Sequence, residues 1–318
     1  MQALKPKVSI IGCGNVGMRY AYAMVIKGLA RQIVLVDREI KKAEGEAMDL
    51  AHGAPFVSPV EILAGNYADT ADSDIVVITA GSKQKPGQSR IELVKDNTEV
   101  FRKIIPDIMK YAPGAILLVV SNPVDVLTYV AYKLSGKPSS EVIGSGTVLD
   151  SARFRHELAN HCLIDPHNIH AYILGEHGDS EFPVWSRALI GGVQFTDYCL
   201  VCKKRNGCDH KPILDGIFTK VRDSAYKIIE MKGETSYGIG LAATRITQAI
   251  LHDENAILPV SSLVKDYLGI NDIYLSLPAV INKKGIRDVM KIGLNETEEK
   301  ALVSSAAAVK KVIADIGL

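Results

Sequence analysis

A strand, a glycine turn and the start of a helix are encoded by Lys7-Val8-Ser9-Ile10-Ile11-Gly12-Cys13-Gly14-Asn15-Val16-Gly17. Residues 7–12 form a short, largely apolar run, which is typical of a strand buried on both faces. The glycines match G-x-G-x-x-G, and a helix pattern follows from Asn15 to about Gly28. The glycine pattern alone is a weak signal. Its position between a strand and a helix predicts a dinucleotide-binding unit.

Each glycine has a separate physical role in such a unit. Gly12 permits the tight turn, Gly14 lets the backbone approach a pyrophosphate at the helix N-terminus, and Gly17 allows close helix–strand packing. Asp37 stands twenty positions after Gly17, at the end of the next apolar strand. Its carboxylate would accept the ribose hydroxyls and repel a 2′-phosphate, so NAD is favoured over NADP despite the neighbouring Arg38. A purely structural glycine turn would not need this carboxylate.

Strand and helix signals alternate through the first half of the chain. Strands are expected at 32–36, 74–79 and 115–120, and helices at 90–111 and 124–134. This alternation predicts an α/β fold, a Rossmann-type doubly wound parallel sheet, over residues 1–147.

After residue 147 the pattern changes. Helices are expected at about 148–160, 212–231, 236–251 and 296–316, strands around 169–174 and 192–201, and short strands with turns over 256–293. This order predicts a mixed α+β substrate domain over residues 148–318, packed closely against the first domain.

Composition limits the class of protein. The 318 residues are 47% hydrophobic, enough for a large core and two domains. With 37 basic and 36 acidic residues the net charge is +1, so no strong positive electrostatic potential favours binding to nucleic acid or to an acidic membrane. The chain has no apolar run of membrane-spanning length and opens directly into a strand, which predicts a protein without a signal peptide. An odd number of cysteines, five, suits a reducing cytoplasm.

A cluster of thiols raises the question of a metal. Cys199, Cys202, Cys208 and His210 lie close together, but a structural zinc site usually has two well-spaced ligand pairs. The last two candidates are separated by one residue, so surface thiols on a loop are the favoured interpretation. No metal is predicted.

Two further stretches contain residues suited to acid–base chemistry. Leu174-Gly175-Glu176-His177-Gly178-Asp179-Ser180 holds a histidine in a glycine frame, and Leu149-Asp150-Ser151-Ala152-Arg153-Phe154-Arg155 lies upstream. His177 would exchange a proton with a 2-hydroxy acid, and Asp150 would orient the imidazole and favour its charged form. Arg153 would bind a substrate carboxylate by two parallel hydrogen bonds. A surface histidine and a helix-surface salt bridge are the alternatives.

With these motifs the chain resembles the lactate/malate dehydrogenases over essentially its whole length. The resemblance implies further contacts with NAD at Val16, Lys42, Tyr67, Gly81, Ser82, Val120, Asn122, Ser145 and Ile239. Several of these residues follow expected strands, and open α/β sheets bind ligands at the carboxyl ends of their strands.

The same resemblance implies how the substrate is chosen. Arg90, after a polar loop, matches a residue that polarises the substrate carbonyl, and Asn122 matches one that binds the substrate oxygen. Gln84 stands where malate enzymes carry arginine and lactate enzymes glutamine, because an arginine pairs with a second carboxylate. Glu176 and Thr235 also match the lactate enzymes. The expected reaction is therefore the NADH-dependent reduction of pyruvate to L-lactate, an end step of fermentative glycolysis.

Arg155 and His170 match residues that line an anion pocket across a subunit two-fold axis in bacterial lactate enzymes. Fructose 1,6-bisphosphate is therefore a possible allosteric effector, and a homotetramer is the expected assembly. The alternative interpretation is a pair of interface residues that bind stray phosphate.

Two other functions stay open on the sequence alone. One is malate dehydrogenase activity, and the other is a non-catalytic NAD-binding protein built on the same fold. Loss of His177, Asp150 or Arg153 would favour a non-catalytic role, but the chain retains all three.

Overall fold

The computed structural model describes residues 5–82, 90–198 and 210–317, the side chains of Arg90 and His210 excepted. Six parallel strands form the N-terminal part of the sheet: β1 (Lys7–Ile11), β2 (Gln32–Val36), β3 (Glu61–Gly65), β4 (Ile75–Ile78), β5 (Ile116–Val119) and β6 (Val142–Gly144). They lie in the order β6-β5-β4-β1-β2-β3. This is the doubly wound order of a dinucleotide-binding fold, with its crevice where the order reverses beside β1. The predicted fold class is confirmed.

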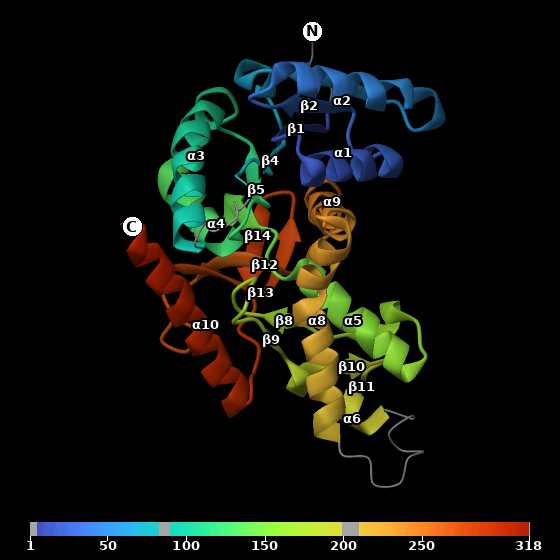
Figure 1. Cartoon of the computed structure of the whole chain (residues 1–318), viewed down its shortest axis with the longest axis vertical. Helices are drawn as coiled ribbons and strands as arrows, with labels where there is room; N and C mark the ends of the chain where they lie inside the picture. Colours follow the sequence, from blue (N-terminus) through green and yellow to red (C-terminus); the bar gives the residue numbers. More distant parts are fainter. Residues whose placement is uncertain (1–4, 83–89, 199–209, 318) are drawn as a thin grey trace.

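Helices cover both faces of the sheet (Figure 1). One face packs against α1 (Asn15–Lys27), α2 (Ile40–His52) and α9 (Tyr237–Leu251), the other against α3 (Arg90–Tyr111), α4 (Val124–Ser135) and α10 (Glu296–Asp315). Successive strand side chains point to opposite faces, so Ile10 enters one hydrophobic core and Ile11 the other. This two-sided burial explains why the strands are continuous apolar runs.

The sheet continues into the second half of the chain. There β12 (Ala256–Val264), β13 (Ile273–Asn282) and β14 (Gly285–Val289) pair antiparallel, and β12 joins β6 where Ser261 faces Gly144. A Cβ at Gly144 would lie 2.7 Å from the Cβ of Ser261, so a larger residue would push the strands apart. The prediction of short strands over 256–293 was wrong in length, because β12 and β13 have nine and ten residues.

A third hydrophobic core lies below the sheet (Figure 1). Its elements are α5 (Val148–Cys162), β7 (Ile169–His170), β8 (Ile173–Leu174), β10 (Leu189–Ile190), α6 (Phe195–Tyr198) and α8 (His210–Lys232), beside the short strands β9 (Phe182–Pro183) and β11 (Val193–Gln194). Within the described residues, 3-10 turns lie at 54–56, 67–70, 139–141, 166–168 and 185–187.

The strand predicted at 192–201 was largely wrong. Over residues 192–198, the described part of that range, only β11 is a strand. Helix α6 follows it directly, with Phe195 buried in the third core. Burial of this aromatic residue by helices α5 and α8 outweighs the local preference for a strand. Among the described residues, no helix combines the length and apolar character needed to cross a membrane.

Candidate active site

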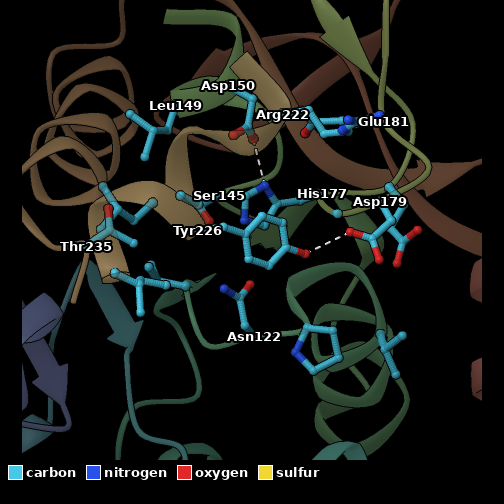
Figure 2. Close-up of a pocket in the computed structure, with 18 of the residues that line it drawn as sticks. Asn122, Ser145, Leu149, Asp150, His177, Asp179, Glu181, Arg222, Tyr226 and Thr235 are labelled. Carbon is cyan, nitrogen blue, oxygen red and sulfur yellow. Dashed lines mark hydrogen bonds and ion pairs between the residues drawn. The ribbon is translucent and has the colours of Figure 1, made fainter. Parts of the chain in front are cut away.

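A pocket of about 370 Å³ lies between the sheet and the helices of the second half. It brings together nine residues that the sequence analysis assigned to the site: Val16, Val120, Asn122, Ser145, Asp150, Arg153, His177, Thr235 and Ile239. Figure 2 shows His177 inside this pocket, joined to Asp150 by a hydrogen bond, with Asn122 and Thr235 on other walls. Residues from both halves of the chain therefore form one site.

Asp150 connects the other two charged groups of the site. One carboxylate oxygen lies 2.6 Å from Nδ1 of His177, and the other accepts a hydrogen bond of 2.8 Å from Arg153. Asp150 and Arg153 are three positions apart on α5, so they share one face of that helix. The side chain of Asp150 is 3% exposed and that of His177 25%, so the carboxylate is fixed while the ring faces the pocket.

The pKa values of the pair follow from these contacts. Burial alone would lower the pKa of His177, but the charge and hydrogen bond of Asp150, aided by Glu181 and Asp125, raise it to about 9. Burial alone would raise the pKa of Asp150, yet His177 and Arg153 hold it below its ordinary value. At neutral pH the site therefore holds an imidazolium, which can donate a proton.

Residues distant in the sequence fix the backbone of the histidine loop. Asp125 accepts the backbone N–H of His177 at 2.7 Å and the hydroxyl of Ser261 at 2.5 Å. Ser305 on α10 accepts the backbone N–H of Glu176 at 2.7 Å. Burial raises the pKa of Asp125 to about 6, against both of its hydrogen bonds. Sequence reasoning assigned no role to these residues, although Asp125 stands three positions after Asn122.

A second acidic group on the pocket wall was also missed. Glu181 is 7% exposed and follows the glycine-framed stretch directly. One of its carboxylate oxygens, one of Asp150 and a ring nitrogen of His177 lie within 4.8 Å of one another. Arg222 and Tyr226 of α8 line the same pocket, and Tyr226 donates a hydrogen bond of 2.8 Å to Asp179 (Figure 2). Proximity in sequence to His177 was the one signal for Glu181.

The glycine turn has the shape that a dinucleotide requires. A Cβ on Gly12 would lie 2.6 Å from the backbone nitrogen of Ala80, and one on Gly17 would lie 2.1 Å from the carbonyl oxygen of Gly12. A Cβ on Gly14 would meet nothing within 4 Å, so this glycine faces open space. Gly14 also caps α1 without a side-chain hydrogen bond. The N-terminal end of α1 therefore has open space beside Gly14, as the approach of a phosphate requires.

Asp37 and Tyr67, two of the residues expected to contact NAD, follow the carboxyl ends of the neighbouring strands β2 and β3. Asp37 follows β2, and its carboxylate accepts the backbone N–H groups of Cys13 at 2.7 Å and Glu39 at 3.0 Å. Burial, then the charge of Asp37, raises the pKa of the Cys13 thiol to about 12, while Lys42 opposes the rise. Burial, with smaller effects from Asp107 and Asp37, raises the pKa of Tyr67 to about 12. Asp37 therefore lies close enough to act electrostatically on both Cys13 and Tyr67, and Lys42 close enough to act on Cys13.

A buried amide links the segments after β4 and β5. Asn97 on α3 accepts the backbone N–H of Ser82 at 2.7 Å and donates to the backbone oxygen of Asn122 at 2.9 Å. Gly81 lies against the same side chain, since a Cβ added to Gly81 would be 3.4 Å from Oδ1 of Asn97, an ordinary van der Waals contact. Gly81, Ser82 and Asn122 are thereby held at the carboxyl edge of the sheet.

Gln84, Cys199, Cys202 and Cys208 lie outside the described residues, and the side chains of Arg90 and His210 are not described either. The backbone of Arg90 begins α3.

The residues predicted for an effector lie away from the pocket. Arg155 is half-buried on α5, where its Nε donates to the carbonyl of Ser151 at 3.3 Å, and burial lowers its pKa. His170 is exposed on β7.

Comparisons with known proteins agree with this geometry. Residues 6–144 match the NAD-binding domain of the lactate/malate dehydrogenases, and residues 147–317 match their alpha/beta C-terminal domain. The L-lactate dehydrogenase 1 of Clostridium acetobutylicum is 51% identical over 311 residues, 98% of each chain.

Solved structures show the same likeness. A lactate dehydrogenase enzyme from a deep-sea metagenome library of the Medee basin has a TM-score of 0.94 at 47% identity, over 99% of this chain and 100% of that one. The minor L-lactate dehydrogenase of Enterococcus mundtii has a TM-score of 0.92 at 40% identity, over 98% of each. The chain belongs to the lactate/malate dehydrogenase family.

Proposed function

We propose that this protein is an NAD-dependent L-lactate dehydrogenase, which interconverts pyruvate and L-lactate. The observation that carries the proposal is the Arg153–Asp150–His177 arrangement in a pocket also lined by Val16 and Ile239. NAD, when bound, exchanges a hydride with the carbon that bears the substrate oxygen. The relatives named lactate dehydrogenases support this choice within the family.

His177 transfers the proton of the reaction. In pyruvate reduction its imidazolium donates to the substrate oxygen, and in lactate oxidation the neutral ring accepts the hydroxyl proton. Because Asp150 binds Nδ1, Nε2 is the ring nitrogen left to face the substrate. Asp150 thereby sets the orientation of the ring and stabilises its charged form.

Arg153 binds the substrate carboxylate. One of its terminal nitrogens donates to Asp150, and this contact holds the guanidinium at the pocket wall. The planar group has further N–H donors for a carboxylate. Asn122, which Asn97 holds through its backbone, supplies an amide for the substrate oxygen.

The glycine turn and Asp37 fit NAD. Gly14 leaves open space for the pyrophosphate, and Gly12 and Gly17 leave no room for a side chain on the opposite side of the turn. Asp37 has two acceptor oxygens at the end of β2, and its negative charge disfavours a 2′-phosphate. Lys42, Tyr67, Gly81, Ser82, Val120 and Ser145 are proposed contacts along the same edge.

Gln84 and Arg90 complete the proposed substrate site. Glutamine stands at position 84 in place of the arginine that would pair with a second substrate carboxylate. Thr235 on the pocket wall is consistent with a small, uncharged substrate end.

A direct assay tests the function. NADH consumption should be followed with pyruvate and, in parallel, with oxaloacetate. We expect rapid NADH consumption with pyruvate and little with oxaloacetate. Preference for oxaloacetate would show a malate dehydrogenase, and consumption with neither acid would support a non-catalytic NAD-binding role.

We further propose a homotetramer in which Arg155 and His170 bind fructose 1,6-bisphosphate across a two-fold axis. Doubling each residue would place up to four positive groups around one site, and a bisphosphate would relieve their repulsion. Arg155 shares α5 with Arg153, so the effector could act on the substrate site through that helix.

Pyruvate saturation curves should be measured in phosphate-free buffer at low enzyme concentration. Fructose 1,6-bisphosphate should lower KM, and Arg155→Gln should remove the effect. Identical curves with and without the effector would leave Arg155 and His170 as interface residues.

A further inference from the structure

Glu181 is a buried carboxyl group that the proposed reaction does not use. It lies just before β9, next to the histidine loop, and lines the pocket with Arg153 and Arg222. Its 7% exposure and its position within 4.8 Å of Asp150 and His177 place two acidic groups side by side in a confined space. Two neighbouring carboxylates in such a space rarely both stay ionised.

Asp150 and Glu181 differ in their contacts with the neighbouring positively charged side chains. Asp150 accepts hydrogen bonds from Arg153 at 2.8 Å and from His177 at 2.6 Å. Within the described part of the chain, no hydrogen bond to the carboxylate of Glu181 is found. Arg222 acts on Glu181 through space only, and its own Nε donates to Asp223 at 2.9 Å. Asp150 is therefore the stabilised anion, and Glu181 is the group that accepts a proton.

The surrounding elements all contribute to this balance. Groups facing the Glu181–His177 pair are Asp150 and Arg153 on α5, Arg222 on α8, Asp125 on α4, and Glu176 and Asp179 on the histidine loop. Burial and then Asp150 raise the pKa of Glu181 to about 8, against the opposing charges of His177, Arg153 and Arg222. Around neutral pH the carboxyl group is thus mostly neutral.

We propose that Glu181 must carry a proton for a 2-oxo acid to bind, in addition to the proton that His177 must carry. This inference rests on the proposed function, because it assumes that the substrate carboxylate binds Arg153. An ionised Glu181 would add an unpaired negative charge to a pocket that receives an anion, and such repulsion is strong away from water. Glu181 takes its proton from solvent and returns it on release, so the net reaction still consumes one proton, through His177.

The test uses the NADH-loaded enzyme and oxamate, in which an amino group replaces the methyl group of pyruvate, so that binding is measured without turnover. Affinity is followed by NADH fluorescence from pH 6 to above pH 10. If both Glu181 and His177 must be protonated, the affinity for oxamate should fall about a hundredfold per pH unit once the pH exceeds both pKa values. Glu181→Gln, which resembles the neutral carboxyl, should bind oxamate within about threefold of the unmodified enzyme at pH 7 and lose only about tenfold per pH unit above pH 9.

Two further variants separate a titrating role from a structural one. Glu181→Asp should restore the steep dependence, because it restores an ionisable group. Glu230→Gln, at an exposed position of the same helix as Arg222, should keep the steep dependence.

A tenfold dependence in the unmodified enzyme, or a hundredfold dependence kept by Glu181→Gln, would overturn the assignment of Glu181. Absence of oxamate binding at every pH, together with absence of NADH oxidation by pyruvate, would instead contradict the proposed function.

Discussion

At the scale of single residues, His177 shows how burial and charge oppose each other. Burial disfavours its imidazolium, but Asp150 at 2.6 Å outweighs burial and raises the pKa to about 9. The histidine is therefore positively charged at neutral pH, in the form needed for pyruvate reduction. The same contact leaves Asp150 ionised, so the pair acts as one unit.

The pH dependence of catalysis follows from this ionisation. The kcat/KM for pyruvate should fall as pH rises, first as Glu181 ionises near pH 8 and more steeply through about 9, because the neutral ring of His177 cannot donate a proton. His177→Asn should reduce turnover by about a thousandfold or more, while NADH binding, measured by fluorescence, should change little. Activity within about tenfold of the unmodified enzyme would show that another group transfers the proton.

Gln84 is the residue expected to determine substrate choice. Gln84→Arg should shift the ratio of kcat/KM values from pyruvate toward oxaloacetate, by on the order of a thousandfold, because a second carboxylate would gain a partner. Gln88→Arg, four positions further along the chain, serves as the matched control and should keep the preference for pyruvate. Equal use of both acids by the unmodified enzyme would contradict this role of Gln84.

At the scale of elements, different glycines of the turn before α1 contribute to folding stability and to ligand binding. Gly17 has no room for a methyl group, whereas Gly14 has open space and an ordinary extended backbone. The two positions belong to one motif but differ in what they face. Gly17 faces the protein, and Gly14 faces the space proposed for the pyrophosphate.

Two substitutions distinguish these roles. Gly17→Ala should lower the free energy of unfolding by about 3 kcal/mol or more, because its Cβ would overlap the carbonyl of Gly12 and push α1 from the sheet. Gly14→Ala should change stability by less than about 1 kcal/mol but weaken NADH binding at least about tenfold. Urea unfolding and NADH titration measure the two effects. A Gly14→Ala enzyme with unchanged NADH affinity would place the pyrophosphate elsewhere.

At the scale of the whole molecule, one nine-stranded sheet runs through both halves of the chain. The joint between β6 and β12 is close because Gly144 has no side chain. The pocket lies beside this joint, and Asp125 is hydrogen-bonded both to Ser261 of β12 and to the backbone of His177. The second half therefore stabilises the first as well as completing the site.

Because the two halves of the chain share one sheet and one site, we expect them to unfold cooperatively. Urea unfolding followed by circular dichroism and by the fluorescence of Trp185, which packs against the third core, should give coincident transitions. Gly144→Val should lower both midpoints together, since it separates β6 from β12. Two resolved transitions in the unmodified protein would show that the halves fold independently.

The sequence by itself determined the features that depend on local order. A strand, three glycines, a helix and Asp37 predicted the doubly wound fold and an NAD site, because turn geometry and hydrophobic alternation act between near neighbours. The three-residue spacing of Asp150 and Arg153 likewise placed them on one helix face. Resemblance to the family then supplied the remaining residue roles.

Only the tertiary structure decided which residues share the site's charges. Glu181 faces Asp150, Asp125 binds the backbone of the His177 loop, and Ser261 completes that contact from a strand far along the chain. The pKa of a buried group depends on its burial and on every charge around it, and both come from segments that meet only after folding. For the same reason the sequence did not reveal the junction of β6 and β12 or the helix at Phe195.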